Sequence, residues 1–204
     1  LESHEVVKRI TIDEKTAFWR AVMDHAHDRG IEVYWFTWNV FTNGTSGQYG
    51  ITDDLDNATT RDYFRKSVRE TVLTYPRLAG IGITSGENME HKDGSKGKEE
   101  WLWATYGEGI SDALKKQPER KFRLIHRLHE TGLGPLLKQW EKYPGPFEVS
   151  YKYAVAHMYA SRAPSFIQKV LPEITSEHRT WLTVRNDDLY SFRWGDPDFA
   201  RAFI

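Results

Sequence analysis

Short apolar runs alternate with longer stretches of helical spacing along the whole chain. The short runs are rich in β-branched and aromatic residues, which favour strands, and they predict strands near 31–38, 78–84, 122–128, 147–153 and 180–185. Between these runs, apolar residues recur at helical intervals, and the predicted helices lie near 13–28, 59–75, 98–116, 133–142 and 165–171. Asp13 is the predicted N-cap of the first helix, and Asp196 that of a last one.

This alternation predicts an α/β protein built of parallel βαβ units. An open doubly wound sheet and a (β/α)8 TIM barrel both fit it. The motif G-x-G-x-x-G, which marks the first strand-helix turn of a nucleotide-binding sheet, does not occur. Polar residues instead follow strand after strand at the C-terminal end, where barrel enzymes carry their chemistry. The pattern therefore favours a TIM barrel.

The length of the chain predicts one domain, residues 1–204, that holds only part of such a barrel. The five predicted strands correspond to five βα units, whereas a full barrel takes roughly 250 residues. The sequence begins on Leu1 and shows no signal-peptide pattern, and we interpret it as a segment of a longer protein. We therefore expect the remainder of the barrel, or additional domains, outside this chain. Strand edges should be unpaired where those parts are missing.

Composition and charge argue against several classes of function. The 28 basic and 29 acidic residues give a net charge of −1, which predicts neither a nucleic-acid partner nor an anionic membrane partner. No apolar run approaches the roughly 20 residues of a membrane span. The chain has no cysteine, which excludes disulfides and thiol nucleophiles, and nothing predicts a metal or a cofactor. Aromatic residues make up 14% of the chain, enough for either a large core or flat surfaces that bind sugars.

Polar and aromatic side chains gather where the predicted strands end. They are Trp38 and Asn39, Glu87 and Asn88, His129 and Glu130, then Glu148, Ser150, Tyr151 and Lys152, and finally Arg185 to Asp188. By the predicted boundaries, Glu148 itself lies near the start of its strand. Two carboxyl groups on one rim suit the cleavage of a glycosidic bond, because one protonates the leaving group while the other activates water or attacks the sugar. Aromatic rings can stack on sugars; the candidates are Trp35, Trp38 and Tyr151. Basic side chains can pair with the carboxylate of a uronic acid; the candidates are Arg127, Lys152 and Arg185.

Each of these residues also has an ordinary structural interpretation. A glutamate at a strand end is more often solvated or capping than catalytic. Trp35 lies in the middle of its strand and fits the core. The stretch "HRLH" (His126 to His129) can form a polar rim, and its spacing is not that of a metal site.

Four stretches resemble the catalytic barrel of the α-glucuronidase-like glycoside hydrolases, a group that includes bacterial proteins often labelled carbohydrate-binding. They are "YWFTWNVF", "YGITDD", "LAGIGITSGENM" and "GPFEVSYKYAVAHMY", and the resemblance extends over most of the chain. It implies a TIM barrel that hydrolyses polysaccharide or oligosaccharide bearing uronic acids, with inversion at the anomeric carbon.

The resemblance also implies roles for single residues. Glu87 in "TSGENM" matches the family's general acid, and Glu148 in "GPFE" matches one member of its general-base pair. The second member is a glutamate in the family, whereas this chain has "RNDD", and Asp187 is the nearest match. Glu130 is the next candidate for the acid. The substrate-binding residues that we predict are Trp38, Asn39, Asn88, Arg127, His129, Lys152 and Arg185.

The departure at "RNDD" leaves three functions open. The first is a hydrolase of plant or algal polysaccharide fragments, in which a carbohydrate is the partner. The second is a carbohydrate-binding protein that keeps the barrel but has lost its base. The third is a sugar lyase or isomerase on the same scaffold, since fold does not determine function. The expected location is periplasmic or extracellular.

Overall fold

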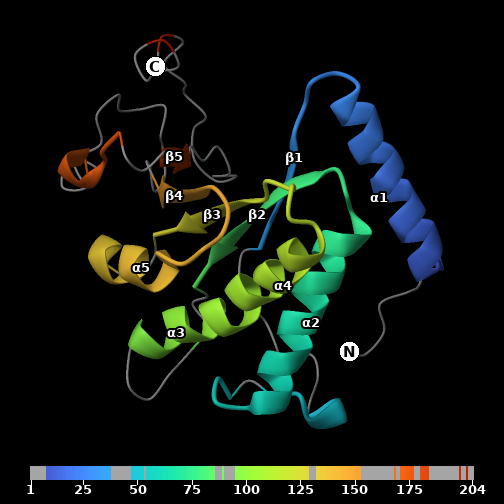
Figure 1. The fold of residues 1–204 in the computed structure, drawn as a ribbon, viewed down its shortest axis with the longest axis horizontal. Coiled ribbons are helices and arrows are strands. Elements are labelled where there is room, and N and C mark those ends of the chain that lie inside the picture. Colours follow the sequence, from blue (N-terminus) through green and yellow to red (C-terminus); the bar gives the residue numbers. More distant parts are fainter. Residues whose placement is uncertain are drawn as a thin grey trace, which may run out of the picture.

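The structure of the chain, a computed structural model, is an α/β fold in which helices cover a parallel sheet (Figure 1). It describes residues 8–37, 47–52, 54–85, 89, 95–128, 132–152, 168, 171–176, 180–183, 198 and 201. The sheet has five strands in the order β1-β2-β3-β4-β5, and each neighbouring pair is parallel. The strands are β1 (Val33–Phe36), β2 (Leu78–Thr84), β3 (Arg123–Arg127), β4 (Phe147–Lys152) and β5 (Thr180–Thr183). All five lie where the sequence predicts them.

Helical segments precede and connect the strands. They are α1 (Ile12–His27), the 3₁₀ turn η2 (Gln48–Gly50), α2 (Ala58–Thr74), α3 (Ser95–Leu102), the π-helical segment η3 (Trp103–Gly107), α4 (Glu108–Lys116), α5 (Leu133–Trp140) and the 3₁₀ turn η6 (Leu171–Glu173). The single helix predicted at 98–116 is therefore three consecutive segments. The helices predicted at 165–171 and after Asp196 lie largely outside the described residues. No helix in the described part of the chain is long and apolar enough to cross a membrane.

The N-terminus of α1 differs from the prediction by two residues. The cap is Thr11, whose hydroxyl accepts a hydrogen bond from the backbone N–H of Glu14 at 3.1 Å. The Glu14 carboxylate in turn accepts from the backbone N–H of Thr11 at 2.7 Å. This reciprocal capping box satisfies two otherwise unpaired groups, and the predicted cap Asp13 lies inside the first turn, where an acidic side chain suits the helix dipole.

One face of the sheet packs against the helices and forms the core. Trp35 of β1 lies edge-on to Trp19 of α1 and to Tyr75 after α2, with ring centroids 5.5 and 4.7 Å apart. The ring of Phe147 in β4 stacks on Trp140 of α5. The prediction that Trp35 belongs to the core is thus confirmed.

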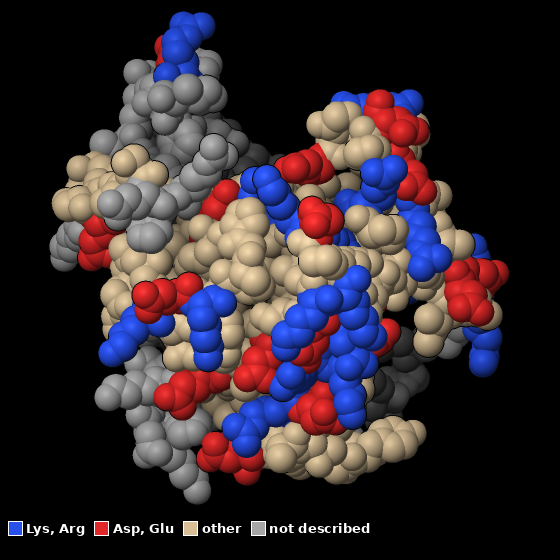
Figure 2. Space-filling view, viewed as in Figure 1, with Lys and Arg blue, Asp and Glu red and all other residues tan. Residues whose placement is uncertain are grey.

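Charged side chains join the outer surfaces of α2 and α4. Arg65 of α2 pairs with Glu108 and Asp112 of α4, the second at 2.7 Å. Figure 2 shows basic and acidic side chains interleaved over this part of the surface. Mixed charge of this kind holds the two helices side by side at the surface, while apolar contacts hold them below it.

Two glycines of β2 make room for neighbours on the opposite face of the sheet. A Cβ added to Gly80 would lie 2.2 Å from the carbonyl oxygen of Arg123, and one added to Gly82 would lie 2.1 Å from the ring of Phe36. Any side chain at either position would clash. The alternation of glycine with isoleucine in "GIGI" therefore reflects close packing on one face and a hydrophobic core on the other.

The sheet is strongly curved, and its concave face is the one turned away from the helices. Tyr34 of β1 and Trp181 of β5 come from opposite edges of the sheet, yet their ring centroids are 5.8 Å apart. Strands in a flat sheet lie about 4.8 Å apart, which would separate these two strands by roughly 19 Å. The contact requires the two edges to bend toward each other.

Candidate functional site

The segments that carry the predicted site leave the sheet along one edge. The strands end at Phe36, Thr84, Arg127, Lys152 and Thr183, and because the strands are parallel, these ends share the C-terminal edge. Thr84 pairs with Arg127, and Arg127 with Ser150. Seven predicted residues follow these strand ends in the sequence and lie outside the described residues: Trp38, Asn39, Glu87, Asn88, His129, Arg185 and Asp187.

Three predicted residues are described, and they occupy different levels of the sheet. Arg127 is the last residue of β3 and is half-buried. Lys152 is the last residue of β4 and pairs with Thr183 of β5. Glu148 is the second residue of β4 and pairs with Ile125 in the middle of β3. Arg127 and Lys152 therefore end their strands at the C-terminal edge, whereas Glu148 lies four residues before the end of β4.

Hydrogen bonds and buried side chains hold the backbone next to the C-terminal ends of β1 and β2. Thr37, which precedes Trp38, donates its backbone N–H to the carbonyl oxygen of Gly82 at 2.8 Å. Burial raises the pKa of Tyr106 in η3, and a hydrogen bond with the side chain of Thr37 partly offsets that rise. Ser85, which precedes the segment with Glu87, is fully buried. The backbone is thus held at Thr37 and at Ser85, where two of the described ranges end.

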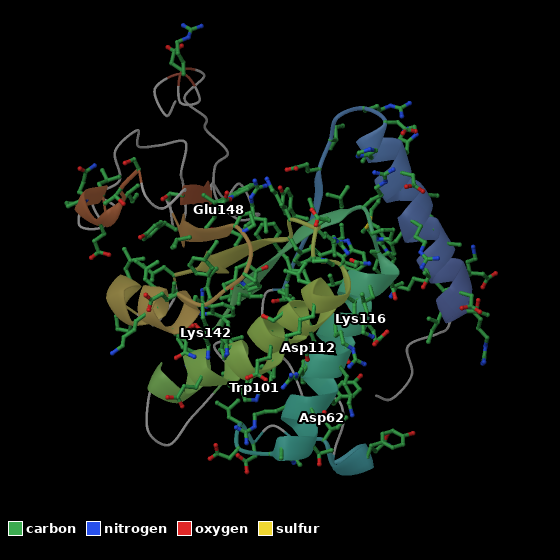
Figure 3. The ribbon with its side chains drawn as sticks, in the orientation of Figure 1. Asp62, Trp101, Asp112, Lys116, Lys142 and Glu148 are labelled. Atoms are coloured by element: carbon green, nitrogen blue, oxygen red, sulfur yellow. The ribbon has the colours of Figure 1, made fainter. Side chains whose placement is uncertain are left out.

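Glu148 belongs to a polar cluster on the concave face. Its side chain is only 7% exposed, and its Oε1 lies 2.9 Å from Nε of Arg123 without hydrogen-bond geometry, as an ion pair. Its Oε2 accepts a short hydrogen bond from the indole N–H of Trp181. Figure 3 shows Glu148 on the strands, apart from Trp101 and Asp112 of the covering helices.

The same cluster continues to the start of β1. Arg123 also lies 3.2 Å from the carboxylate of Glu32 and donates to the hydroxyl of Tyr34, which in turn donates to Glu32. Burial, together with the hydrogen bond to Glu32, raises the pKa of Tyr34 to about 12. The hydrogen bond from Tyr34 lowers the pKa of Glu32. We refer to Glu32, Tyr34, Arg123, Glu148 and Trp181 as the concave-face cluster.

The surroundings of Glu148 favour a structural role. Arg123 is the first residue of β3, so Glu148 interacts toward the N-terminal ends of the strands, whereas barrel enzymes act at the C-terminal ends. A general base must also reach water or substrate within hydrogen-bond distance, and both carboxyl oxygens of Glu148 already contact nitrogen atoms of the protein. The role that the resemblance implies for Glu148 therefore stays a prediction with little support from its contacts.

The sequence analysis did not single out Tyr34, Arg123 and Trp181. The signal that could have found them is the two-residue period of a strand, which puts alternate residues on one face. Counted from Glu148 through the strand register, this period assigns Arg123, Tyr34 and Trp181 to the same face as the glutamate. The register itself required the structure. No group of three metal-binding side chains occurs among the residues that the structure describes.

Comparison with known proteins shows the fold. No family model matches the chain, and no curated protein sequence matches it. A solved structure does match: a GH138 enzyme targeting pectin rhamnogalacturonan II, at 21% sequence identity and a TM-score of 0.80. The match covers 97% of this chain and 24% of that enzyme. At this identity the likeness establishes a shared α/β architecture, and the chain spans about a quarter of the length of that enzyme.

Proposed function

We propose that the chain is part of a (β/α)8 TIM barrel, about five βα units in one domain, from a glycoside hydrolase-type carbohydrate-active protein. The observation that carries this proposal is the likeness to the GH138 enzyme along 97% of the chain. That enzyme targets a pectic polysaccharide, and the proposed substrate here is likewise a polysaccharide or oligosaccharide that bears uronic acids.

The topology supports the barrel. Strands in consecutive order, all parallel, with helices on one face are the arrangement of a barrel wall. The contact between Tyr34 and Trp181 shows that the wall curves. The two edge strands β1 and β5 would pair with further strands, supplied by the rest of a longer protein, to complete the barrel.

In the proposed site, Glu87 is the general acid. Asp187 contributes to the general base, for which Glu148 is the other member implied by the resemblance. Glu87 and Asp187 each follow the end of a strand in the sequence, β2 in the case of Glu87 and β5 in the case of Asp187. Inverting hydrolases separate their two carboxyl groups by roughly 6.5–9.5 Å to admit a water molecule. Arg127, Lys152 and Arg185 are the proposed partners of the uronic-acid carboxylate, with Trp38, Asn39, Asn88 and His129 as further substrate contacts.

The substitution Glu87→Gln tests this function. Because it removes the proton donor but keeps the shape, we expect turnover to fall by about 10²–10⁴-fold while binding of the oligosaccharide persists. The measurements are reducing-sugar release and calorimetric binding with a panel of pectic, glucuronoxylan and ulvan-type oligosaccharides. Glu100→Gln, at an exposed position of α3, is the matched control and should leave both quantities unchanged. Turnover that survives in Glu87→Gln would transfer the acid role to another residue, with Glu130 the next candidate.

The contacts of Glu148 favour one alternative, a carbohydrate-binding protein without catalysis. A barrel whose matched base is held in an ion pair with Arg123 can still bind a sugar at its rim. In that case the wild-type protein binds an oligosaccharide of the panel and releases no reducing sugar from any of them.

A further inference from the structure

A second buried polar cluster lies on the opposite, helix-covered face of the sheet. His126 of β3 is completely buried and Glu99 of α3 is 5% exposed. The imidazole Nε2 lies 2.9 Å from Oε2 of Glu99, and the indole N–H of Trp140 in α5 donates to the same oxygen at 3.0 Å. We call these three residues the His126–Glu99–Trp140 cluster. It connects one strand to two helices.

The acceptors around His126 determine where its protons lie. Nδ1 is 3.0 Å from the backbone carbonyl oxygen of Arg127, and because a carbonyl oxygen only accepts, Nδ1 must carry a proton. Oε2 of Glu99 already accepts from the N–H of Trp140, as a charged carboxylate oxygen readily does twice. Nε2 and Oε2 therefore have one proton between them, and the buried contact is a hydrogen bond whichever of the two atoms carries it. Removing one partner leaves a buried polar atom without its hydrogen bond, which is costly.

The hydrogen bond to Arg127 fastens the last peptide group of β3. That group consists of the carbonyl of Arg127 and the N–H of Leu128, which donates to the carbonyl oxygen of Ser150 at 2.8 Å. The peptide is thus held on one side by β4 and on the other by the ring of His126. The next residues along the chain are His129 and Glu130, two of the predicted rim residues.

Glu99 holds α3, the helix that follows the segment with Glu87 in the sequence. It lies in the first two turns of α3, the helix that begins at Ser95, eight residues after Glu87. A carboxylate held by both His126 and Trp140 fixes the start of α3 against β3 and α5. In the sequence, Glu87 and Asn88 therefore stand between two anchored points, the buried Ser85 and α3.

We propose that His126 and Glu99 are positioning residues for the rim. Their buried contact holds the end of β3, which His129 follows in the sequence, at a set distance from α3, which begins eight residues after Glu87. This role rests on the proposed function only for its catalytic consequence. Its structural core, the fastening of the last peptide of β3, stands on the distances alone.

Nuclear magnetic resonance on the whole chain tests the proposal through two signals. The first is the proton on Nδ1 of His126, which should exchange slowly with solvent because it is buried and bonded to the carbonyl oxygen of Arg127, while the exposed His25 and His27 provide reference signals. In Glu99→Gln this proton should exchange faster, because the ring loses its contact with the carboxylate at Nε2.

The second signal is hydrogen exchange at the two ends of β3. The amide of Leu128 bonds to Ser150 at the C-terminal end, and the amide of Leu124 bonds to Pro146 at the N-terminal end at 2.9 Å. In Glu99→Gln we expect exchange at Leu128 to be about tenfold faster or more, and exchange at Leu124 to be nearly unchanged, as for a local loss of a buried hydrogen bond. Equal acceleration at both amides would mean that the pair only stabilises the fold, and unchanged exchange at Leu128 would equally overturn the proposal.

Trp140→Phe is the second variant should Glu99→Gln fail to fold, because it keeps an aromatic ring at this position while it removes the N–H that donates to Glu99, together with part of the buried indole. It should shift the two signals in the same direction by a smaller amount, and no shift at His126 or Leu128 would contradict the proposal. If the chain releases sugar, Glu99→Gln should lower kcat more than it raises KM. Exchange of the His126 ring proton and of the Leu128 amide does not depend on turnover, so failure of the proposed function leaves this test intact.

Discussion

At the scale of residues, the chain puts ionisable groups in two settings on opposite faces of one sheet, the first partly and the second fully buried. On the concave face, Arg123 lies between the carboxylates of Glu32 and Glu148. On the helix-covered face, His126 pairs with Glu99. Buried ion pairs contribute little net stability but cost much when one partner is removed. These residues therefore act as constraints on geometry more than as sources of stability.

Glu148→Gln should lower the free energy of unfolding by about 3 kcal/mol, because Arg123 loses a buried partner. Urea denaturation measures this change in the free energy of unfolding. The double variant Arg123→Met with Glu148→Leu should recover much of this loss, since it removes both charges. Glu70→Gln, on an exposed ion pair with Arg69, is the control and should change stability by less than about 1 kcal/mol. A fully stable Glu148→Gln that has lost activity would instead support the catalytic role of Glu148.

At the scale of elements, the helices between β2 and β3 form one continuous but irregular unit. α3 and α4 are separated by the π-helical η3, where a Cβ on Gly107 would lie 2.7 Å from the ring of Trp103. The wider turn directs Tyr106 toward Thr37 at the end of β1. π-Helical turns are frequent at functional sites, and this one supports the strand end from which Trp38 follows.

The ion pair between Arg65 of α2 and Asp112 of α4 should make the free energy of unfolding fall when the pH becomes acidic. The hydrogen bond from Arg65 lowers the pKa of Asp112. A carboxyl group with a lowered pKa stabilises the fold fully above its unfolded pKa of about 3.9, and the contribution is lost as the pH falls through the folded value. Asp112→Asn should therefore be less stable than wild type at neutral pH and lose less on acidification below about pH 4.

Denaturation at a series of pH values provides the comparison. Asp62→Asn is the control, because the pair of Asp62 with Lys66 is more than half exposed. If wild type and Asp112→Asn show parallel pH curves, the Arg65 contact does not stabilise the fold.

At the scale of the whole molecule, the curvature of the sheet decides which residues meet. Tyr34 and Trp181 lie at opposite edges, and their contact joins the concave-face cluster across the sheet. Trp181 remains 39% exposed and Phe36, on the same face, 59%. The concave face of the described sheet is therefore partly open.

A double-mutant cycle measures this curvature in solution. Tyr34→Leu and Trp181→Leu should show a coupling energy of about 0.5–1.5 kcal/mol, typical of an aromatic pair in contact. The control pair is Tyr34→Leu with Phe147→Leu, which face opposite sides of the sheet and should be additive within about 0.5 kcal/mol. Additive effects for Tyr34 and Trp181 would mean that the sheet is flatter and that the barrel interpretation fails.

The sequence by itself determined the elements and their order. β-Branched runs such as "LAGIGIT" can bury both faces only between helices or against a barrel interior, and the spacing of apolar residues predicted most of the helices between them. The strictly alternating order then predicted parallel strands. These are local properties of the chain, which is why the boundaries of β2 and β4 agree with the predictions to within one residue.

Only the tertiary structure decided the register, the curvature and the partners of buried charges. Glu148 is a strand residue in either description, but its contacts with Arg123 and Trp181 depend on how neighbouring strands are offset. Likewise, "HRLH" predicted a polar rim, whereas His126 is buried against Glu99, 27 residues away in the chain. Contacts between distant segments follow from packing the whole sheet and its helices, and no local pattern of residues encodes them.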